Sequence, residues 1–241
     1  MNALSSILIW ILAGSYFSGV LITILILSRF RSAAEMDPLI KRLVRGLFRI
    51  IGSEIVLEFQ EPIPHDTPVI FMANHSSLID IPLLQMVIPR HFVGILAKHQ
   101  FNFFLYGKTV ARLGHLAIDR SNPRASLKIF EQAKRHLKNG TSIVVLPEGG
   151  RSLDGHLIPF KKLPFRFAID ADAQIVPISI SGAFRMKSKA SWKLRPGLLT
   201  IRFGSIVTTT AFERNSEGVE SLRDHVYQKI YAGLDDFEKG V

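Results

Sequence analysis

The chain has 241 residues, a hydrophobic fraction of 47% and a formal net charge of +10, with an isoelectric point near 10.0. This length and hydrophobicity suffice for one substantial domain and argue against a disordered chain, and the absence of cysteine excludes disulfides, cysteine-ligated metals and thiol nucleophiles. The positive charge favours an acidic partner, namely phospholipid headgroups, the phosphates of coenzyme A or an acidic carrier protein, with nucleic acid as the rival.

An apolar run without charged side chains covers residues 7–27. As a helix rising ~1.5 Å per residue, it would cross a hydrocarbon core roughly 30 Å thick. A signal peptide fits less well, because the run is long and no basic residue precedes it. Basic residues follow the run, so the positive-inside rule predicts a cytoplasmic or inner membrane protein with its later part on the cytoplasmic side. Small residues between Gly14 and Thr23 leave open a broken helix in one leaflet.

A second helix is predicted after this run, with Asp37 as its N-cap and Pro38 in the first helical position. Apolar residues from Leu39 to Ile51 recur at helical spacing, and basic residues fill the positions between them. Such a helix lies at the interface of an anionic bilayer or packs its apolar stripe on a domain core, and the sequence leaves both open. We expect N-terminal membrane-anchoring helices in 1–52.

Strands and helices alternate through 53–241, which we expect to form a second domain. The expected strands are 55–59, 69–72, 91–97, 116–118, 142–146, 175–180 and 199–203. The expected helices begin after Ser77 and cover 100–112, 124–138 and roughly 218–231. This alternation predicts an α/β fold with a largely parallel central sheet flanked by helices, joined to the N-terminal membrane helix and the basic amphipathic helix.

A histidine and a carboxylate follow the second expected strand. Asp80 comes five positions after His75, and a helix capped by Ser76 or Ser77 and starting at Leu78 would bring its carboxylate back towards the imidazole. A carboxylate on one ring nitrogen fixes the tautomer and stabilises the cation that forms when the other takes a proton. The pair is a candidate general base for an alcohol. The alternative is a capping box of Ser77 and Asp80 beside an idle loop histidine.

A second candidate segment, Glu148-Gly149-Gly150-Arg151, follows the expected strand at 142–146. Glycines let backbone N–H groups approach an anion, and the planar guanidinium of arginine suits a phosphate. The ordinary alternative is a surface turn closed by a Glu/Arg ion pair.

These segments together resemble the glycerolipid acyltransferase family, the membrane enzymes that include 1-acyl-sn-glycerol-3-phosphate acyltransferases (lysophosphatidic acid acyltransferases). Asn74, His75 and Asp80 match its first block, Asn-His-x-x-x-x-Asp. The stretch 114–120 matches the second block, which ends in Arg120. The resemblance implies that His75 is the base, that Asp80 orients it, and that Arg120 holds the phosphate of the acceptor.

The resemblance covers roughly residues 65 to 210. The third block, Pro-Glu-Gly-Thr-Arg-Ser, is matched at 147–152, and the fourth, Val-Pro-Ile, at 176–178. Two departures put the identity of the acceptor in doubt: Gly150 replaces the usual threonine, and Leu163 stands where glycine is common.

The candidate site residues are therefore catalytic His75 and Asp80, and substrate-binding Asn74, Lys98, Arg120, Glu148, Gly149, Gly150 and Arg151. His75, Glu148 and Arg120 each follow an expected strand, as does Lys98, and ligand sites on parallel sheets gather at the carboxyl ends of strands. This placement is independent of the family.

The resemblance implies a membrane-bound O-acyltransferase that moves a fatty acyl group from acyl-CoA or acyl-carrier protein to the free hydroxyl of lysophosphatidic acid, giving phosphatidic acid. We expect membrane phospholipid as a further partner, no nucleic acid, no cofactor and no metal. Direct attack on the thioester is expected, because there is no Gly-x-Ser-x-Gly elbow and no cysteine. The alternatives are another lysolipid or amino-acid lipid as acceptor, a lipid hydrolase, a metal-assisted version, or a non-catalytic membrane tether.

Overall fold

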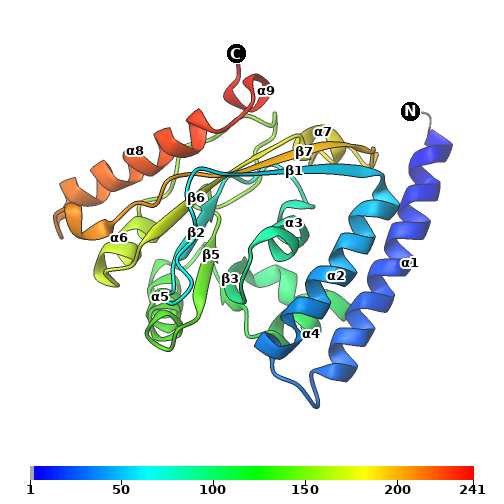
Figure 1. The fold of residues 1–241 in the computed structure, drawn as a ribbon, viewed down its shortest axis with the longest axis horizontal. Helices are drawn as coiled ribbons and strands as arrows, with labels where there is room; N and C mark the ends of the chain where they lie inside the picture. Colours follow the sequence, from blue (N-terminus) through cyan, green and yellow to red (C-terminus); the bar gives the residue numbers. More distant parts are fainter. Residues whose placement is uncertain (1–2) are drawn as a thin grey trace.

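A seven-stranded sheet forms the centre of the computed structural model, which describes residues 3–241 (Figure 1). The strands are β1 (Ser53–Phe59), β2 (Ile70–Ala73), β3 (Phe92–Ala97), β4 (Leu116–Ile118), β5 (Ser142–Val145), β6 (Ile175–Ser181) and β7 (Gly197–Phe203). Their order across the sheet is β1-β7-β6-β2-β5-β3-β4. Every neighbouring pair is parallel except β6 and β7, so the predicted α/β fold with a largely parallel sheet is confirmed.

Helices cover both faces of this sheet (Figure 1). They are α1 (Ala3–Leu27), α2 (Ala33–Ile51), α3 (Asp80–Val87), α4 (Phe104–Arg112), α5 (Pro123–Lys138), α6 (Leu163–Asp170), α7 (Ala183–Met186), α8 (Ser216–Ala232) and α9 (Asp236–Lys239), with 3₁₀ turns η1 (Lys98–Asn102) and η2 (Thr209–Ala211). The sequence reading did not predict α6, α7 and α9, and it joined η1 and α4 into a single helix.

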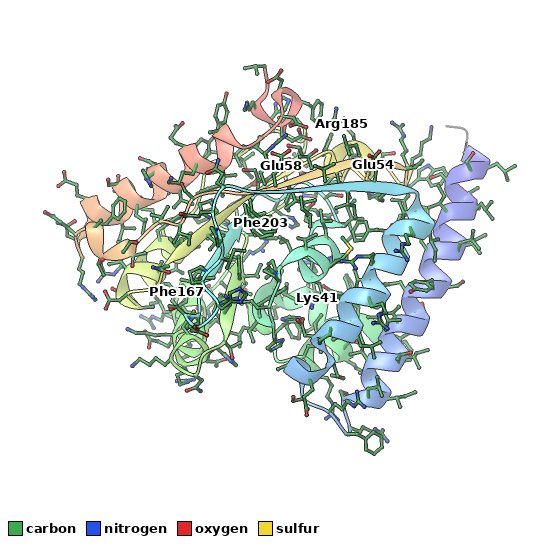
Figure 2. All side chains as sticks on the ribbon, viewed as in Figure 1. Lys41, Glu54, Glu58, Phe167, Arg185 and Phe203 are labelled. Carbon is green, nitrogen blue, oxygen red and sulfur yellow. The ribbon has the colours of Figure 1, made fainter. Side chains whose placement is uncertain are left out.

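Alternation along β2 divides the hydrophobic core between the two faces of the sheet. Phe71 packs in a cluster with α1, α2, α3 and Phe203, whereas Ile70 and Met72 pack in a second cluster with α5, α6 and α8. Successive strand side chains point to opposite faces, so a fully apolar strand serves both clusters. Figure 2 shows Phe203 on β7 and Phe167 on α6, one from each cluster. The four residues of β2 are consequently all buried.

The helix α1 is long and apolar enough to cross a membrane by length and composition. Its buried side chains extend along the whole helix, from Ser6 through Ala13 to Ile24, and they pack against the rest of the protein. The opposite side is apolar and exposed, with Leu4, Leu8 and other large side chains facing outward. The helix therefore combines a protein-facing side with an outward apolar side.

The predicted N-cap of the second helix is wrong. Helix α2 starts earlier, with Ser32 as its N-cap: the Ser32 hydroxyl accepts from the Glu35 N–H, and the Glu35 carboxylate accepts from the Ser32 N–H. Asp37 lies within the helix, where it is buried and accepts a hydrogen bond from Gln85 at 3.1 Å. The apolar stripe of α2, which includes Phe48, packs into the core, so the structure selects the core-packed alternative.

Candidate active site

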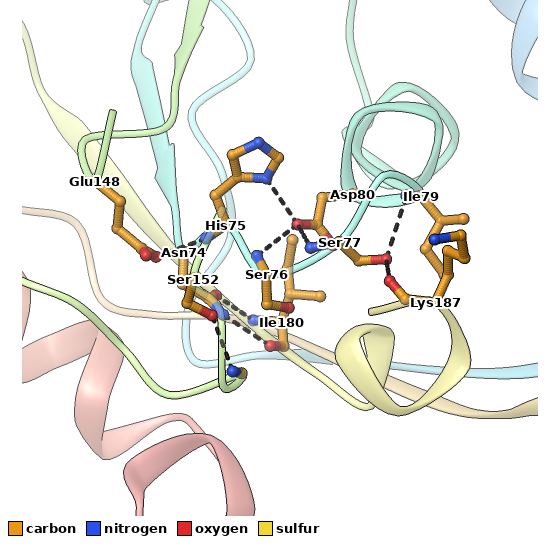
Figure 3. Close-up of polar contacts among 11 residues, drawn as sticks. Asn74, His75, Ser76, Ser77, Ile79, Asp80, Glu148, Ser152, Ile180 and Lys187 are labelled. Carbon is orange, nitrogen blue, oxygen red and sulfur yellow. Dashed lines mark hydrogen bonds and ion pairs between the residues drawn. The ribbon is translucent and has the colours of Figure 1, made fainter. Parts of the chain in front are cut away.

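The carboxylate of Asp80 holds the imidazole of His75. Asp80 Oδ2 lies 2.8 Å from His75 Nδ1, and both residues are buried (Figure 3). With Nδ1 donating to this carboxylate, the neutral ring carries its lone pair on Nε2, which points away from Asp80 in Figure 3. The predicted meeting of these two side chains is confirmed. The ring can accept a proton at Nε2, and the carboxylate of Asp80 is placed to stabilise the imidazolium that forms.

Backbone N–H groups fix the Asp80 carboxylate from the other side. Oδ2 accepts from the N–H of Ser76 and from the N–H of Ser77, each at 2.8 Å. The expected role of these serines is partly wrong, because helix α3 starts at Asp80 with Ile79 as its N-cap and has no side-chain cap. The serines act through their backbone, as donors to a carboxylate at the first position of the helix, where negative charge is favoured.

A pair of amide hydrogen bonds ties the start of the candidate catalytic turn, residues 74–80, to β6. Asn74 Nδ2 donates to the carbonyl of Ile180 at 2.9 Å, and its Oδ1 accepts from the N–H of Ile180 at 2.7 Å (Figure 3). Asn74 directly follows β2, and its side-chain amide makes hydrogen bonds to the β6 backbone where the pairing of β2 with β6 ends. This pairing gives Asn74 a positioning function for His75, the next residue.

The side chain of Glu148 supports the backbone of His75. Its Oε1 accepts from the N–H of His75 at 2.6 Å, and its Oε2 is buried without a hydrogen-bond partner in residues 3–241. Burial raises the pKa of Glu148 to about 9, so the side chain is protonated at neutral pH. The predicted segment 148–151 thus contacts the candidate base through a bond from the His75 backbone N–H to the Glu148 side chain. Glu148 forms no ion pair with Arg151, and the ordinary surface-turn alternative does not apply.

The glycine pair turns the chain back past His75. Gly149 has φ of +75°, in the left-handed region that favours glycine, and its N–H donates to the carbonyl of Leu146 at 3.1 Å. Within residues 3–241, the N–H of Gly150 has no protein hydrogen-bond partner. Two residues later, the Ser152 N–H donates to the carbonyl of His75 at 3.0 Å. The segment that turns back past His75 therefore includes a backbone donor, the Gly150 N–H, without a protein partner.

Two predicted cations follow the strands β3 and β4, which lie beyond β5 in the sheet. Lys98 begins η1 directly after β3, is largely exposed, and contacts Asp119 at 3.5 Å. Arg120 follows β4 by two residues; partial burial lowers its pKa, but the guanidinium stays charged. An exposed pair at this distance contributes little stability, so the Lys98 amine is available to a ligand.

A residue that the sequence reading missed contacts the catalytic turn. Ser77 Oγ donates to the carbonyl of Lys187 at 2.6 Å, and Lys187 is buried (Figure 3). Lys187 directly follows α7, more than a hundred positions from Ser77. No local pattern marks such a residue, because only the β2–β6 pairing brings it close.

A family model described as Acyltransferase matches residues 54–181, more than half of the chain. The chain belongs to this acyltransferase family. The match contains β1 to β6 and includes the His75 turn, the 148–151 segment and the Asn74 partner on β6.

Curated relatives carry the name 1-acyl-sn-glycerol-3-phosphate acyltransferase. The Cocos nucifera protein is 34% identical over 189 residues, which are 78% of this chain and 59% of that protein. The Limnanthes douglasii protein is 33% identical over 135 residues, or 56% and 48% of the two chains. The acyltransferase chain thus spans about half to three fifths of the length of these relatives.

A solved structure has the same fold. The 1-acyl-sn-glycerophosphate acyltransferase PlsC of Thermotoga maritima superposes with a TM-score of 0.82 at 22% identity, covering 96% of this chain and 97% of that one. Both the N-terminal helices and the sheet therefore belong to the shared architecture.

A small, mostly apolar cavity of the acyltransferase lies between α3 and the strands β3 and β5. Its volume is about 20 Å³, room for about one water, and its lining includes Ile81, Leu96 and His115. Burial lowers the pKa of His115 to about 4, and its Nδ1 accepts from the Gly94 N–H at 2.9 Å. His115 therefore lines this cavity as a neutral imidazole. Among residues 3–241, no cluster of three or more metal-binding side chains is present.

Proposed function

We propose that this acyltransferase moves a fatty acyl group from an acyl thioester to the free hydroxyl of lysophosphatidic acid, giving phosphatidic acid, with His75 as the general base. The observation that carries the proposal is the 2.8 Å contact between His75 Nδ1 and Asp80, which leaves Nε2 as the proton acceptor. The names of the curated relatives support the acceptor.

The reaction proceeds by direct attack. Nε2 of His75 takes the proton of the glycerol hydroxyl while the hydroxyl oxygen bonds to the thioester carbonyl carbon. The carbon–sulfur bond then breaks, and the imidazolium returns the proton to the departing thiolate. Asp80 stabilises the imidazolium between these two transfers. General-base help of this kind contributes roughly 10² to 10⁴ in rate.

The cations beyond β5 bind the phosphate of the acceptor in this proposal. Arg120 and Arg151 offer forks of donors for the phosphate oxygens, and Lys98 adds a point charge. Binding of the phosphate fixes the free hydroxyl against Nε2. Part of the entropy loss of the reaction is then met on binding, which lowers the activation barrier. The unpaired N–H of Gly150 is the candidate donor to the carbonyl oxygen as it becomes an oxyanion.

The chain works at a membrane surface in this proposal, with residues 1–52 as its anchor, 53–241 as its acyltransferase domain, and the latter on the cytoplasmic side. The apolar outer side of α1 supports this placement, and basic residues on α2 favour anionic phospholipid. Acyl-CoA or acyl-carrier protein supplies the acyl group as a co-substrate, with no further cofactor.

An acceptor panel tests the proposed function. Purified protein in detergent is given labelled acyl-CoA, or labelled acyl-carrier protein, with lysophosphatidic acid, lysophosphatidylcholine or lysophosphatidylglycerol. We expect labelled phosphatidic acid as the main product. If another lysolipid receives most of the label, that lipid replaces lysophosphatidic acid as the acceptor in this proposal. Release of free fatty acid without any acceptor would favour the hydrolase alternative.

A further inference from the structure

The 187–195 loop, which leads from α7 to β7, connects the candidate catalytic turn to the N-terminal part of α1 (Figure 1). At its start, the carbonyl of Lys187 accepts from Ser77 Oγ at 2.6 Å. Near its end, the N–H of Leu194 donates to Ser6 Oγ at 2.7 Å, and the carbonyl of Leu194 accepts from that hydroxyl at 3.1 Å. Hydrogen bonds therefore fix the loop to both elements.

Further hydrogen bonds cross-link the loop internally. The ammonium of Lys187 donates to the carbonyls of Ser188 and Ser191, at 2.7 and 2.6 Å. Ser188 Oγ accepts from the N–H of Ser191 at 3.1 Å, and Ser191 Oγ accepts from the N–H of Lys193 at 3.2 Å. The backbone is held by these bonds, so the side chains that the loop exposes have a defined placement relative to α1 and to the candidate catalytic turn.

The positive charge of this loop has no acidic partner. Four of its residues are basic, namely Lys187, Lys189, Lys193 and Arg195, and no aspartate or glutamate occurs between residues 173 and 212. Within residues 3–241, none of these four side chains makes an ion pair. Lys189 and Arg195 are exposed, and Lys193 is half-buried. The loop therefore presents uncompensated positive charge, which favours an anionic partner.

An exposed tryptophan lies among these cations. Trp192 is 51% exposed, and its carbonyl accepts from the indole N–H of Trp10, the other tryptophan of the chain, at 2.7 Å. Ile7 directly follows Ser6, the partner of the loop on α1, and is 46% exposed. Adjacent residues of a helix lie about 100° apart around its axis, so the apolar outer side of α1 begins next to the loop. Tryptophan and lysine beside exposed apolar surface are typical of the headgroup region of a bilayer.

We propose that this loop is a second membrane contact besides α1, in which Trp192 lies at the level of the headgroups while Lys189 and Lys193 bind anionic phospholipid. The proposal rests on the membrane placement of α1 in the proposed function and goes beyond it, because the loop is also bonded to Ser77. Attachment of the loop to the bilayer thereby holds the candidate catalytic turn at a fixed height above the headgroups.

An acidic carrier protein would match the charge of the loop equally well. The exposed indole of Trp192 and the apolar side of α1 next to it favour a bilayer, because both offer apolar surface at the place where the charge is presented. The experiments below separate the two partners.

Vesicle binding tests the two lysines. Full-length Lys189→Gln/Lys193→Gln is compared with Lys128→Gln/Lys138→Gln, which loses the same charge at two exposed positions of α5, on the other face of the sheet from α1. We expect the loop variant to bind phosphatidylglycerol-containing vesicles roughly tenfold or more weakly than wild type, because each lysine near an anionic surface adds about fivefold. The α5 variant should bind like wild type. Equal binding by the two variants would overturn the proposal.

Tryptophan fluorescence tests the position of the indole. Trp192→Phe leaves Trp10 as the single tryptophan and keeps the backbone carbonyl to which Trp10 donates. The emission of wild type minus that of Trp192→Phe is therefore the signal of Trp192. We expect this signal to be quenched when the protein binds anionic vesicles that contain brominated phospholipid. An unquenched Trp192 in vesicle-bound protein would contradict the membrane contact.

A donor assay separates the bilayer from an acidic protein and from the proposed function. The KM for acyl-carrier protein is measured in detergent for wild type and for the loop variant. A raised KM together with unchanged vesicle binding would overturn the lipid contact and assign the loop to an acidic protein. Vesicle binding and quenching need no turnover, so a wild type that fails to acylate lysophosphatidic acid contradicts the proposed function alone.

Discussion

At the residue scale, one carboxylate oxygen organises the candidate base. Asp80 Oδ2 is shared by the imidazole of His75 and by the N–H groups of Ser76 and Ser77. All three partners can donate to it, so this oxygen serves as their common acceptor. The orientation of His75 therefore depends on the charge of Asp80 as well as on its shape.

We expect Asp80→Asn to lower kcat by about 10²-fold or more while the protein remains folded. The amide keeps the size of the side chain, but it cannot stabilise an imidazolium and favours the wrong tautomer. The measurement is the initial rate of labelled phosphatidic acid formation, with circular dichroism as the control for folding. A rate within a few fold of wild type would show that the carboxylate is not needed.

A second prediction concerns pH and Glu148. Its pKa is raised from 4.5 in the unfolded chain to about 9 in the fold, so the unfolded chain loses the proton first. The stability that depends on the protonated side chain is present below about 4.5 and is lost as pH rises towards 9. We expect the urea midpoint to fall over this range more steeply in wild type than in Glu148→Gln, which has no proton to lose.

If the urea midpoint falls with pH equally steeply in wild type and in Glu148→Gln between pH 5 and pH 9, the buried, protonated state of Glu148 is contradicted. Measuring the difference between them removes the contribution of other titrating groups, which both share.

The contact between His75 and Asp80 could be predicted from the sequence, because the two lie within one turn of chain. The clamp of Asn74 on Ile180 and the bond from Ser77 to Lys187 could not. Both join residues more than a hundred positions apart, and a sequence pattern carries no signal for a partner that only sheet pairing supplies.

At the scale of elements, the long apolar and amphipathic segments agree with the sequence prediction, and several of their ends do as well, but the start of α2 does not. The Asp-Pro pair at Asp37 predicted a helix start, yet Ser32 and Glu35 form a capping box one turn earlier. The same Ser-x-x-Glu spacing was readable in the sequence. Asp37 does not cap the helix; it lies buried within α2 and accepts hydrogen bonds from Gln85 and Lys41.

We expect Ser32→Ala to lower the free energy of unfolding by about 1 kcal/mol, because the Glu35 N–H loses its acceptor. The measurement is urea unfolding in detergent. The control is Ser216→Ala, an exposed serine whose hydroxyl makes only a 3.5 Å contact. A cost no larger than that of the control would mean that the cap adds nothing to α2.

At the scale of the whole molecule, the outer side of α1 is an apolar surface that the fold leaves uncovered. Leu8 and Ile11 are 55% and 59% exposed, although the opposite side of the helix is packed on the protein. Apolar surface of this extent on a protein marks an interaction with lipid or another protein. The hydropathy of the segment was plain in the sequence. The contact of α1 with the domain along its whole length, and the antiparallel direction of β7, could not be predicted, because both depend on tertiary packing.

We expect Leu8→Glu combined with Ile11→Glu to weaken co-sedimentation with anionic phospholipid vesicles without unfolding the protein, because both side chains point outward. The matched control is Leu153→Glu, at an exposed position outside α1. Vesicle binding that stays at the wild-type level in the double variant would place the membrane contact elsewhere.

The rate of acyl transfer to lysophosphatidic acid, compared between wild type and His75→Ala, tests the central claim most directly. Both proteins are purified, shown to melt alike, and supplied with the same labelled acyl thioester. The account predicts labelled phosphatidic acid from wild type and a rate lower by roughly 10² to 10⁴ from the variant, because Nε2 is the proton acceptor. Transfer by His75→Ala at the wild-type rate would contradict it.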